Sequence, residues 1–234
     1  MIQETQICKP ANGIEVISMT RRQSRSLSGM KISGITNSVA ILCLLAVCAG
    51  CGGHPKIRKL SPSSVIVAFG DSLTFGTGAG KAESYPSVLS GMIGCRVVNE
   101  GVPGEDTTSG LARLRGVLEN DHPDLVILCH GGNDMLDGED QGITIANLNA
   151  MITKVENAGA DVILIGVPKP GLLLKPAAFY REIAAKQEIP IEPEALAEIL
   201  SSPALKSDAV HPNAAGYRQL AESVKTCIIG SQGK

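Results

Sequence analysis

Two hydrophobic patterns alternate along the chain after residue 64. Short, nearly continuous apolar runs are typical of strands buried on both faces, and apolar residues three or four positions apart are typical of helices. The apolar runs are 65–69, 95–98, 125–129, 161–167 and a weak fifth at 189–191, and the helical segments are 85–93, 109–119, 143–157, 176–186 and 214–228. This alternation predicts an α/β fold, with a parallel sheet covered by helices on both faces.

Residues suited to chemistry follow three of the predicted strands. Ser72 comes after the first run in a Gly-Asp-Ser turn, Gly104 comes after the second run, and Asn133 comes after the third. Parallel sheets bind ligands beyond the carboxyl ends of their strands. We therefore expect these three residues at one edge of the sheet.

A serine hydroxyl becomes a nucleophile when a neighbouring base removes its proton. His211 is the expected base because Asp208, three residues earlier, is placed to orient the imidazole ring. His130 is the alternative, since it ends the third run and is expected to face the cleft. It has no carboxylate at the same local spacing, although Asp134 is near in sequence.

A tetrahedral intermediate of acyl transfer also needs hydrogen-bond donors for its negative oxygen. Asn133 offers a side-chain amide, and Gly104 offers a backbone N–H with no side chain to obstruct it. The N–H of Ser72, at a strand-to-helix turn, is the third candidate donor. Each of these features alone is equally typical of an ordinary turn or cap, but the whole set indicates a serine hydrolase.

The chain resembles the SGNH (GDSL) hydrolase family in four blocks that occur in the family's order. The blocks are Gly70-Asp71-Ser72-Leu73, Gly104, Gly131-Gly132-Asn133-Asp134 and Asp208-Ala209-Val210-His211. The resemblance implies a three-layer α/β/α sandwich, flavodoxin-like, with a five-stranded parallel sheet. It also implies Ser72 as the nucleophile, His211 as the base, Asp208 as its partner, and Ser72, Gly104 and Asn133 as the oxyanion hole.

The segment 99–107 most resembles the bacterial thioesterase, arylesterase and lysophospholipase branch of that family. The branch usually has Ser-Gly-Asp where this chain has Pro103-Gly104-Glu105-Asp106. The expected activity is cleavage of carboxylic or thio esters through an acyl-enzyme, without a cofactor. Three leucines in the loop 168–176 favour acyl chains as substrates. A carbohydrate O-acetyl esterase and a non-catalytic surface lipoprotein are the alternatives.

The first fifty residues differ in composition from the rest. A stretch with several arginines precedes the uncharged apolar run 39–50, which is too short to span a bilayer and is typical of a signal peptide. Cys51 follows Ala49-Gly50 and resembles the lipidated cysteine of bacterial lipoproteins. We expect a signal peptide over residues 1–50, in which the part before Met30 is an over-extended N-terminus. A tether over residues 51–64 and the hydrolase domain over residues 65–230 are expected to follow it. The protein is then exported, periplasmic or anchored to a membrane at Cys51.

Composition excludes several other functions. The chain has 21 Lys and Arg against 23 Asp and Glu, no Trp and no basic patch, so nucleic-acid binding is not expected. Cys95, Cys129 and Cys227 have irregular spacings that suit core thiols and no zinc site. The segment 76–81 lacks the residues that a phosphate-binding loop needs. The expected partner is a small acyl ester, and the expected state is a monomer.

Overall fold

The computed structural model of the protein describes residues 56–171 and 174–233. The predicted signal segment 1–50 and the predicted lipidation site Cys51 lie outside these residues. No helix in the described ranges combines the length and the apolar character that crossing a bilayer requires.

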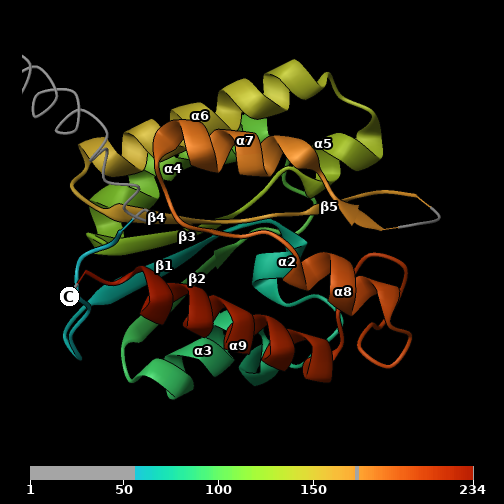
Figure 1. The fold of residues 1–234 in the computed structure, drawn as a ribbon, viewed down its shortest axis with the longest axis horizontal. Helices are drawn as coiled ribbons and strands as arrows, with labels where there is room; N and C mark the ends of the chain where they lie inside the picture. The colour runs from blue at the N-terminus through green and yellow to red at the C-terminus, as the bar shows by residue number, and fades with distance from the viewer. Residues whose placement is uncertain (1–55, 172–173, 234) are drawn as a thin grey trace, which may run out of the picture. The chain divides into compact units, whose positions relative to one another are not determined.

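A parallel sheet of five strands forms the middle layer of the fold (Figure 1). The strand order is β2-β1-β3-β4-β7, and each neighbouring pair is parallel. The central strands are buried along nearly their whole length because helices cover both faces. The strands are β1 (Val65–Gly70), β2 (Arg96–Gly101), β3 (Leu125–Cys129), β4 (Asp161–Ile165) and β7 (Ile191–Glu192).

Helices form the two outer layers. In Figure 1, α4, α6 and α7 lie above the sheet, whereas α3 and α9 lie below it and pack against each other. The helices are α2 (Ser72–Phe75), α3 (Tyr85–Ile93), α4 (Thr107–Asp121), α5 (Gly132–Asp137), α6 (Gln141–Asn157), α7 (Ala178–Gln187), α8 (Ala195–Ser201) and α9 (Ala214–Ser231), with a 3-10 turn η1 (Lys81–Glu83). The predicted α/β/α sandwich with five parallel strands is confirmed.

The hydrophobic pattern of the sequence did not predict some short elements of the structure. These are α5, α8 and the antiparallel hairpin of β5 (Pro168–Lys169) and β6 (Lys175–Pro176), each too short to show a full period. Helix α4 begins two residues before the predicted start because the Asp106 carboxylate accepts a hydrogen bond from the N–H of Ser109 at 2.7 Å.

The order of the strands creates a switch point at β1. Strand β2 pairs with one side of β1 and β3 pairs with the other side. The loops after these strands therefore diverge and leave a crevice. Gly70 ends β1 against β3, and a Cβ there would lie 2.0 Å from the carbonyl oxygen of Cys129. A glycine is therefore required where the chain turns out of the sheet.

Part of the predicted tether contacts the domain. Ile57 is buried and forms a β-bridge with Gln232. The backbone N–H of Arg58 donates to the Asp161 carboxylate at 2.6 Å, and its guanidinium donates to the same carboxylate at 3.0 Å. Asp161 begins β4, so this attachment lies at the end of the sheet opposite to the crevice.

The three cysteines of the described residues are free thiols. Cys129 is completely buried in β3 and Cys95 is buried, whereas Cys227 is half-buried. The buried positions of Cys129 and Cys95 agree with the prediction that these residues are core thiols.

Candidate active site

Ser72 lies at the turn from β1 into the short helix α2. The side chain of Asp71 caps this helix, since its Oδ1 atom accepts from the N–H of Leu73 at 2.9 Å. Burial raises the pKa of the Asp71 carboxyl above its ordinary value, and the hydrogen bond from the N–H of Leu73 only partly opposes that. Ser72 itself is half-buried and lines the crevice, which presents its hydroxyl to a bound molecule.

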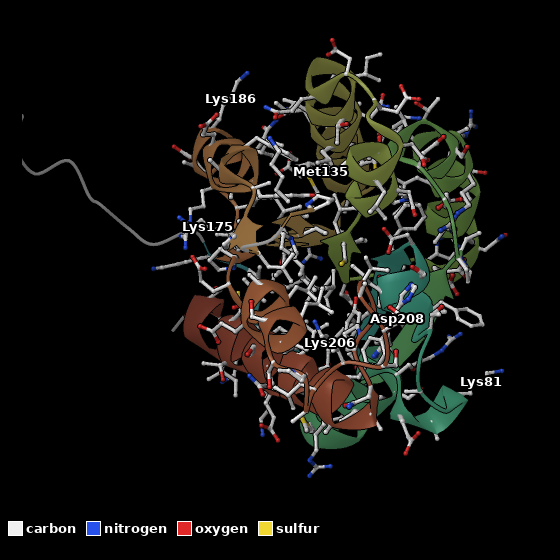
Figure 2. All side chains as sticks on the ribbon, turned by 90° about the vertical axis from the view of Figure 1, so that its right-hand side faces the viewer. Lys81, Met135, Lys175, Lys186, Lys206 and Asp208 are labelled. Carbon is white, nitrogen blue, oxygen red and sulfur yellow. The ribbon has the colours of Figure 1, made fainter. Side chains whose placement is uncertain are left out.

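His211 and Asp208 approach Ser72 from the loop that precedes α9. The His211 Nε2 atom lies 3.0 Å from the Ser72 Oγ atom, and the His211 Nδ1 atom lies 2.8 Å from the Asp208 Oδ2 atom. The loop is closed by Ser207, whose backbone N–H donates to the carbonyl of His211 at 2.9 Å. Figure 2 shows Asp208 on the face at the carboxyl ends of the strands.

The Asp208 carboxylate is held by the backbone of its own loop. Its Oδ1 atom accepts from the N–H groups of Val210 and His211 at 2.8 and 2.9 Å. Desolvation alone would raise the pKa of Asp208, but these N–H bonds and the His211 ring outweigh it, so the pKa lies below the ordinary value. Asp208 is therefore charged whenever His211 can act as a base.

Gly104 and Asn133 line the same cavity as Ser72 and His211. Gly104 has a φ of 78°, a conformation that favours glycine, and a Cβ at this position would meet no atom within 4 Å. Asn133 lies in α5, directly after β3, and its Nδ2 atom donates to the carbonyl oxygen of Glu105 at 2.8 Å. That bond uses one N–H of the amide and leaves the second N–H for another acceptor.

The cavity has a volume of about 290 Å³, and its wall beyond the polar residues is mostly apolar. Leu174, from the loop in which three leucines were noted, forms part of this wall. The neighbouring Leu172 and Leu173 lie outside the described residues. The apolar side chains that line the cavity are Leu73, Pro103, Leu136, Val167, Pro168, Pro170, Leu174, Leu200, Ala209 and Val210.

His130 does not face the cavity, so that expectation was wrong. Its side chain is completely buried, and its Nε2 atom lies 3.1 Å from the Oε2 atom of Glu105. Asp134, the nearby carboxylate, instead accepts from the backbone N–H of Thr107 at 3.0 Å and from the Thr107 hydroxyl. His130 is thus separated from Ser72 and paired with a different carboxylate from the one near it in sequence.

Two charged residues near the site were not identified from the sequence. Glu105 is buried and Arg113 is partly buried, and the Arg113 Nε atom lies 2.6 Å from the Glu105 Oε1 atom. The local sequence showed no sign of their pairing, because it joins the loop after β2 to a residue of α4 eight positions further along the chain. Desolvation would raise the pKa of Glu105, but hydrogen bonds from His130 and Arg113 lower it below the ordinary value.

The described residues contain no group of three or more His, Cys, Asp or Glu side chains arranged to hold a metal ion. Ser72, His211, Gly104 and Asn133 thus line one cavity, and the His211 ring lies within hydrogen-bond distance of the Ser72 hydroxyl, which is the arrangement that a serine nucleophile and a histidine base would require.

Comparison with known proteins gives three kinds of match. The model of the GDSL-like Lipase/Acylhydrolase family matches residues 68–219. The arylesterase of Vibrio mimicus is 29% identical over 178 residues, which is 71% of this chain and 89% of that protein. The thioesterase 1/protease 1/lysophospholipase L1 of Escherichia coli K12 is 28% identical over 163 residues, covering 66% of this chain and 78% of that protein. The crystal structure of TesA superimposes with a TM-score of 0.64 at 26% identity, covering 70% of this chain and 97% of that one.

Proposed function

The chain belongs to the GDSL-like lipase/acylhydrolase family and is a hydrolase of ester bonds, and on this premise we propose that Ser72, His211 and Asp208 carry its reaction. The observation that supports this most is the continuous line of short contacts from Ser72 Oγ through the His211 ring to Asp208. With Nδ1–H donating to Asp208, the Nε2 lone pair points at the serine hydroxyl. This is the tautomer that a general base needs.

In the first half of the proposed reaction, Ser72 Oγ attacks the carbonyl carbon of the ester while His211 Nε2 takes the hydroxyl proton. The resulting imidazolium is stabilised by the charge of Asp208. When the tetrahedral intermediate collapses, the bond from carbon to the alcohol or thiol leaving group breaks, and His211 returns the proton to that group. The acyl group then remains on Ser72 as an ester.

In the second half, water replaces the leaving group. His211 takes a proton from the water while the water oxygen attacks the acyl carbon. The bond between that carbon and Ser72 Oγ then breaks, and His211 returns the proton to Ser72. The products are a carboxylic acid and the free enzyme. In both halves the negative oxygen is held by the N–H groups of Ser72 and Gly104 and by the Asn133 amide, the donors of the proposed oxyanion hole.

We infer that the acyl part of the substrate is a hydrocarbon chain. The support is the apolar wall of the cavity, which offers little to the hydroxyl groups of a sugar but can cover methylene groups. Each buried methylene contributes about 0.8 kcal/mol, which corresponds to about a fourfold gain in kcat/KM. An O-acetyl esterase would gain nothing from this wall.

A series of p-nitrophenyl esters from acetate to laurate tests this inference. We expect kcat/KM to rise by about fourfold for each added methylene until the cavity is full, and then to level off. Leu136 is half exposed and lines the cavity, so Leu136→Ala is expected to flatten the rise without unfolding the protein. Ile229→Ala, at an exposed residue away from the cavity, is the matched control. A maximum at acetate would favour the O-acetyl esterase instead.

We further propose that the protein is exported and anchored to a membrane through Cys51. The support comes from the sequence, in which an uncharged apolar run and two small residues precede this cysteine. The contacts of Arg58 with Asp161 fasten the following chain to the end of the sheet opposite to the cavity.

Fractionation of cells that express the full chain tests the anchor. We expect the wild type and Cys48→Ser to be processed and to carry lipid in the membrane fraction, and Cys51→Ser to keep an uncleaved signal and to carry no lipid. The reason is that only the cysteine at the cleavage point receives the acyl chains. If Cys51→Ser is processed and distributed like the wild type, the protein is exported without a lipid anchor.

A further inference from the structure

A cluster of two charged side chains and a histidine lies directly behind the proposed oxyanion hole. It consists of Glu105 from the loop after β2, Arg113 from α4 and His130 from the end of β3. Glu105 and His130 are buried, and the three groups contact one another through Glu105. None of them has a part in the proton transfers described above. Burying charged groups costs stability unless they are fully paired, so the cluster calls for an explanation.

Arg113 ties the Glu105 carboxylate to two strands of the sheet. Its Nε and Nη2 atoms donate to the two carboxylate oxygens of Glu105 at 2.6 and 2.8 Å, which is a bidentate pair. The same Nη2 atom also donates to the carbonyl oxygen of Glu100 at 2.7 Å, and its guanidinium carbon lies 4.1 Å from the centre of the Phe69 ring. The guanidinium is therefore held by the carboxyl ends of both β1 and β2.

His130 fixes the same carboxylate from the third strand, and its tautomer follows from its neighbours. The N–H of Gly131 donates to His130 Nδ1 at 3.2 Å, so this nitrogen carries no proton. The proton of the neutral ring is then on Nε2, which donates to Glu105 Oε2 at 3.1 Å. Gly110 of α4 leaves the room for this contact, since a Cβ there would lie 2.4 Å from His130 Nε2.

The backbone of Glu105 connects this cluster to the proposed oxyanion hole. Its carbonyl oxygen accepts the hydrogen bond from Asn133 Nδ2, and its N–H donates to the carbonyl of Val102 at 3.2 Å, closing the turn that contains Gly104. A shift of Glu105 therefore moves two of the three proposed donors together. Asn133 has no other hydrogen bond to orient its amide within the described residues.

We propose that Glu105 is a positioning residue, whose side chain, fixed by Arg113 and His130, holds the Asn133 amide and the Gly104 N–H in the geometry that stabilises the oxyanion. The inference rests on the proposed function, because it assigns Glu105 a role through those two donors. It differs from a purely stabilising role in one respect. A stabilising residue acts on the free energy of unfolding, whereas a positioning residue acts on kcat.

A double-mutant cycle between Glu105 and Asn133 tests the proposal. Glu105→Gln keeps the size of the side chain but places an amide where both His130 and Arg113 donate, so one contact must break. We expect kcat to fall by about 10- to 100-fold with KM within about twofold, because misplacement by about 1 Å costs about 100-fold. In the Asn133→Ala background, only the Gly104 N–H is left to be displaced, so the same substitution is expected to lower kcat by a factor at least about threefold smaller than in the wild-type background.

The control is Arg115→Gln, on the same helix but exposed and paired only with Glu119, which is expected to leave kcat unchanged. Thermal unfolding of each variant shows whether it is folded under the assay conditions. Arg113→Lys keeps the charge and loses the bidentate contact, and it replaces Glu105→Gln in the cycle if the latter is unfolded.

The outcomes separate this inference from the proposed function. If Asn133→Ala leaves kcat unchanged, Asn133 is not an oxyanion donor, and both the proposed oxyanion hole and this inference fail. If Asn133→Ala lowers kcat by about 100-fold or more but Glu105→Gln has the same effect in both backgrounds, the donor assignment stands and the positioning role is overturned. A loss confined to thermal stability overturns it in the same way.

Discussion

Replacement of Ser72 by alanine is expected to lower ester hydrolysis by about 10⁴- to 10⁶-fold in kcat and to abolish labelling by a fluorophosphonate probe. Ser72 follows a buried strand and lies within hydrogen-bond distance of a histidine that is paired with a carboxylate, a combination that no other serine of residues 56–171 and 174–233 has. Without its oxygen no acyl-enzyme can form. The purified domain is assayed with a p-nitrophenyl ester and, separately, with the probe.

Ser87→Ala provides the matched control, since this exposed serine of α3 is distant from the cavity residues in the chain and has no part in the site. This variant is expected to hydrolyse the p-nitrophenyl ester at the wild-type rate and to be labelled by the probe at the wild-type rate. Labelling that persists in Ser72→Ala would transfer the nucleophile to another residue and overturn the proposed mechanism.

His211→Ala is expected to lower kcat by about 10⁴-fold or more, because among the described residues it is the His211 ring that lies within hydrogen-bond distance of the Ser72 hydroxyl. His130→Ala is expected to cost about 100-fold or less, since His130 is buried and acts, on our proposal, through Glu105. Measurement of kcat for the two variants decides whether His211 or His130 is the base. The reverse order would assign the base to His130.

The pH dependence of kcat/KM adds a second measurement on the same pair. The pKa of Asp208 lies below its ordinary value, so this carboxylate is already charged throughout the range in which an imidazole titrates. Activity is therefore expected to fall on the acidic side with the slope of a single proton, because only a neutral imidazole can accept the serine proton. Asp208→Asn is expected to move this limb to lower pH, since the imidazolium loses its negative partner. A limb that stays in place would mean that Asp208 does not contact the titrating group.

The predicted elements are accurate where the burial of a segment follows a regular pattern. The run 125–129 coincides with β3, and 85–93 coincides with α3. A strand buried on both faces must be apolar along its length, and this requirement is visible in the residues themselves. Short elements such as α8 and the β5–β6 hairpin depend on what they pack against, so their sequences carry too little periodicity to show them.

The proposed site shows the same difference between local and distant information. Asp208 and His211 are three residues apart, so their pairing could be expected from spacing alone. The position of His130 could not be predicted in this way, because its partner Glu105 is 25 residues away. The choice between Glu105 and Asp134 as that partner depends on the loop after β2. The cluster of Glu105 and Arg113 was missed for this reason.

The sequence by itself determined the alternation of strands and helices, the glycine at the end of β1, and the residue types and local spacing of the proposed catalytic groups. These features depend on contacts within a few residues or on burial that is uniform along a segment. Only the tertiary structure decided that β1 lies between β2 and β3, which brings Ser72, Gly104 and Asn133 to one cavity, and that His130 turns away from it. The physical reason is that strand order and buried ion pairing arise from contacts between segments far apart in the chain, which local sequence patterns do not specify.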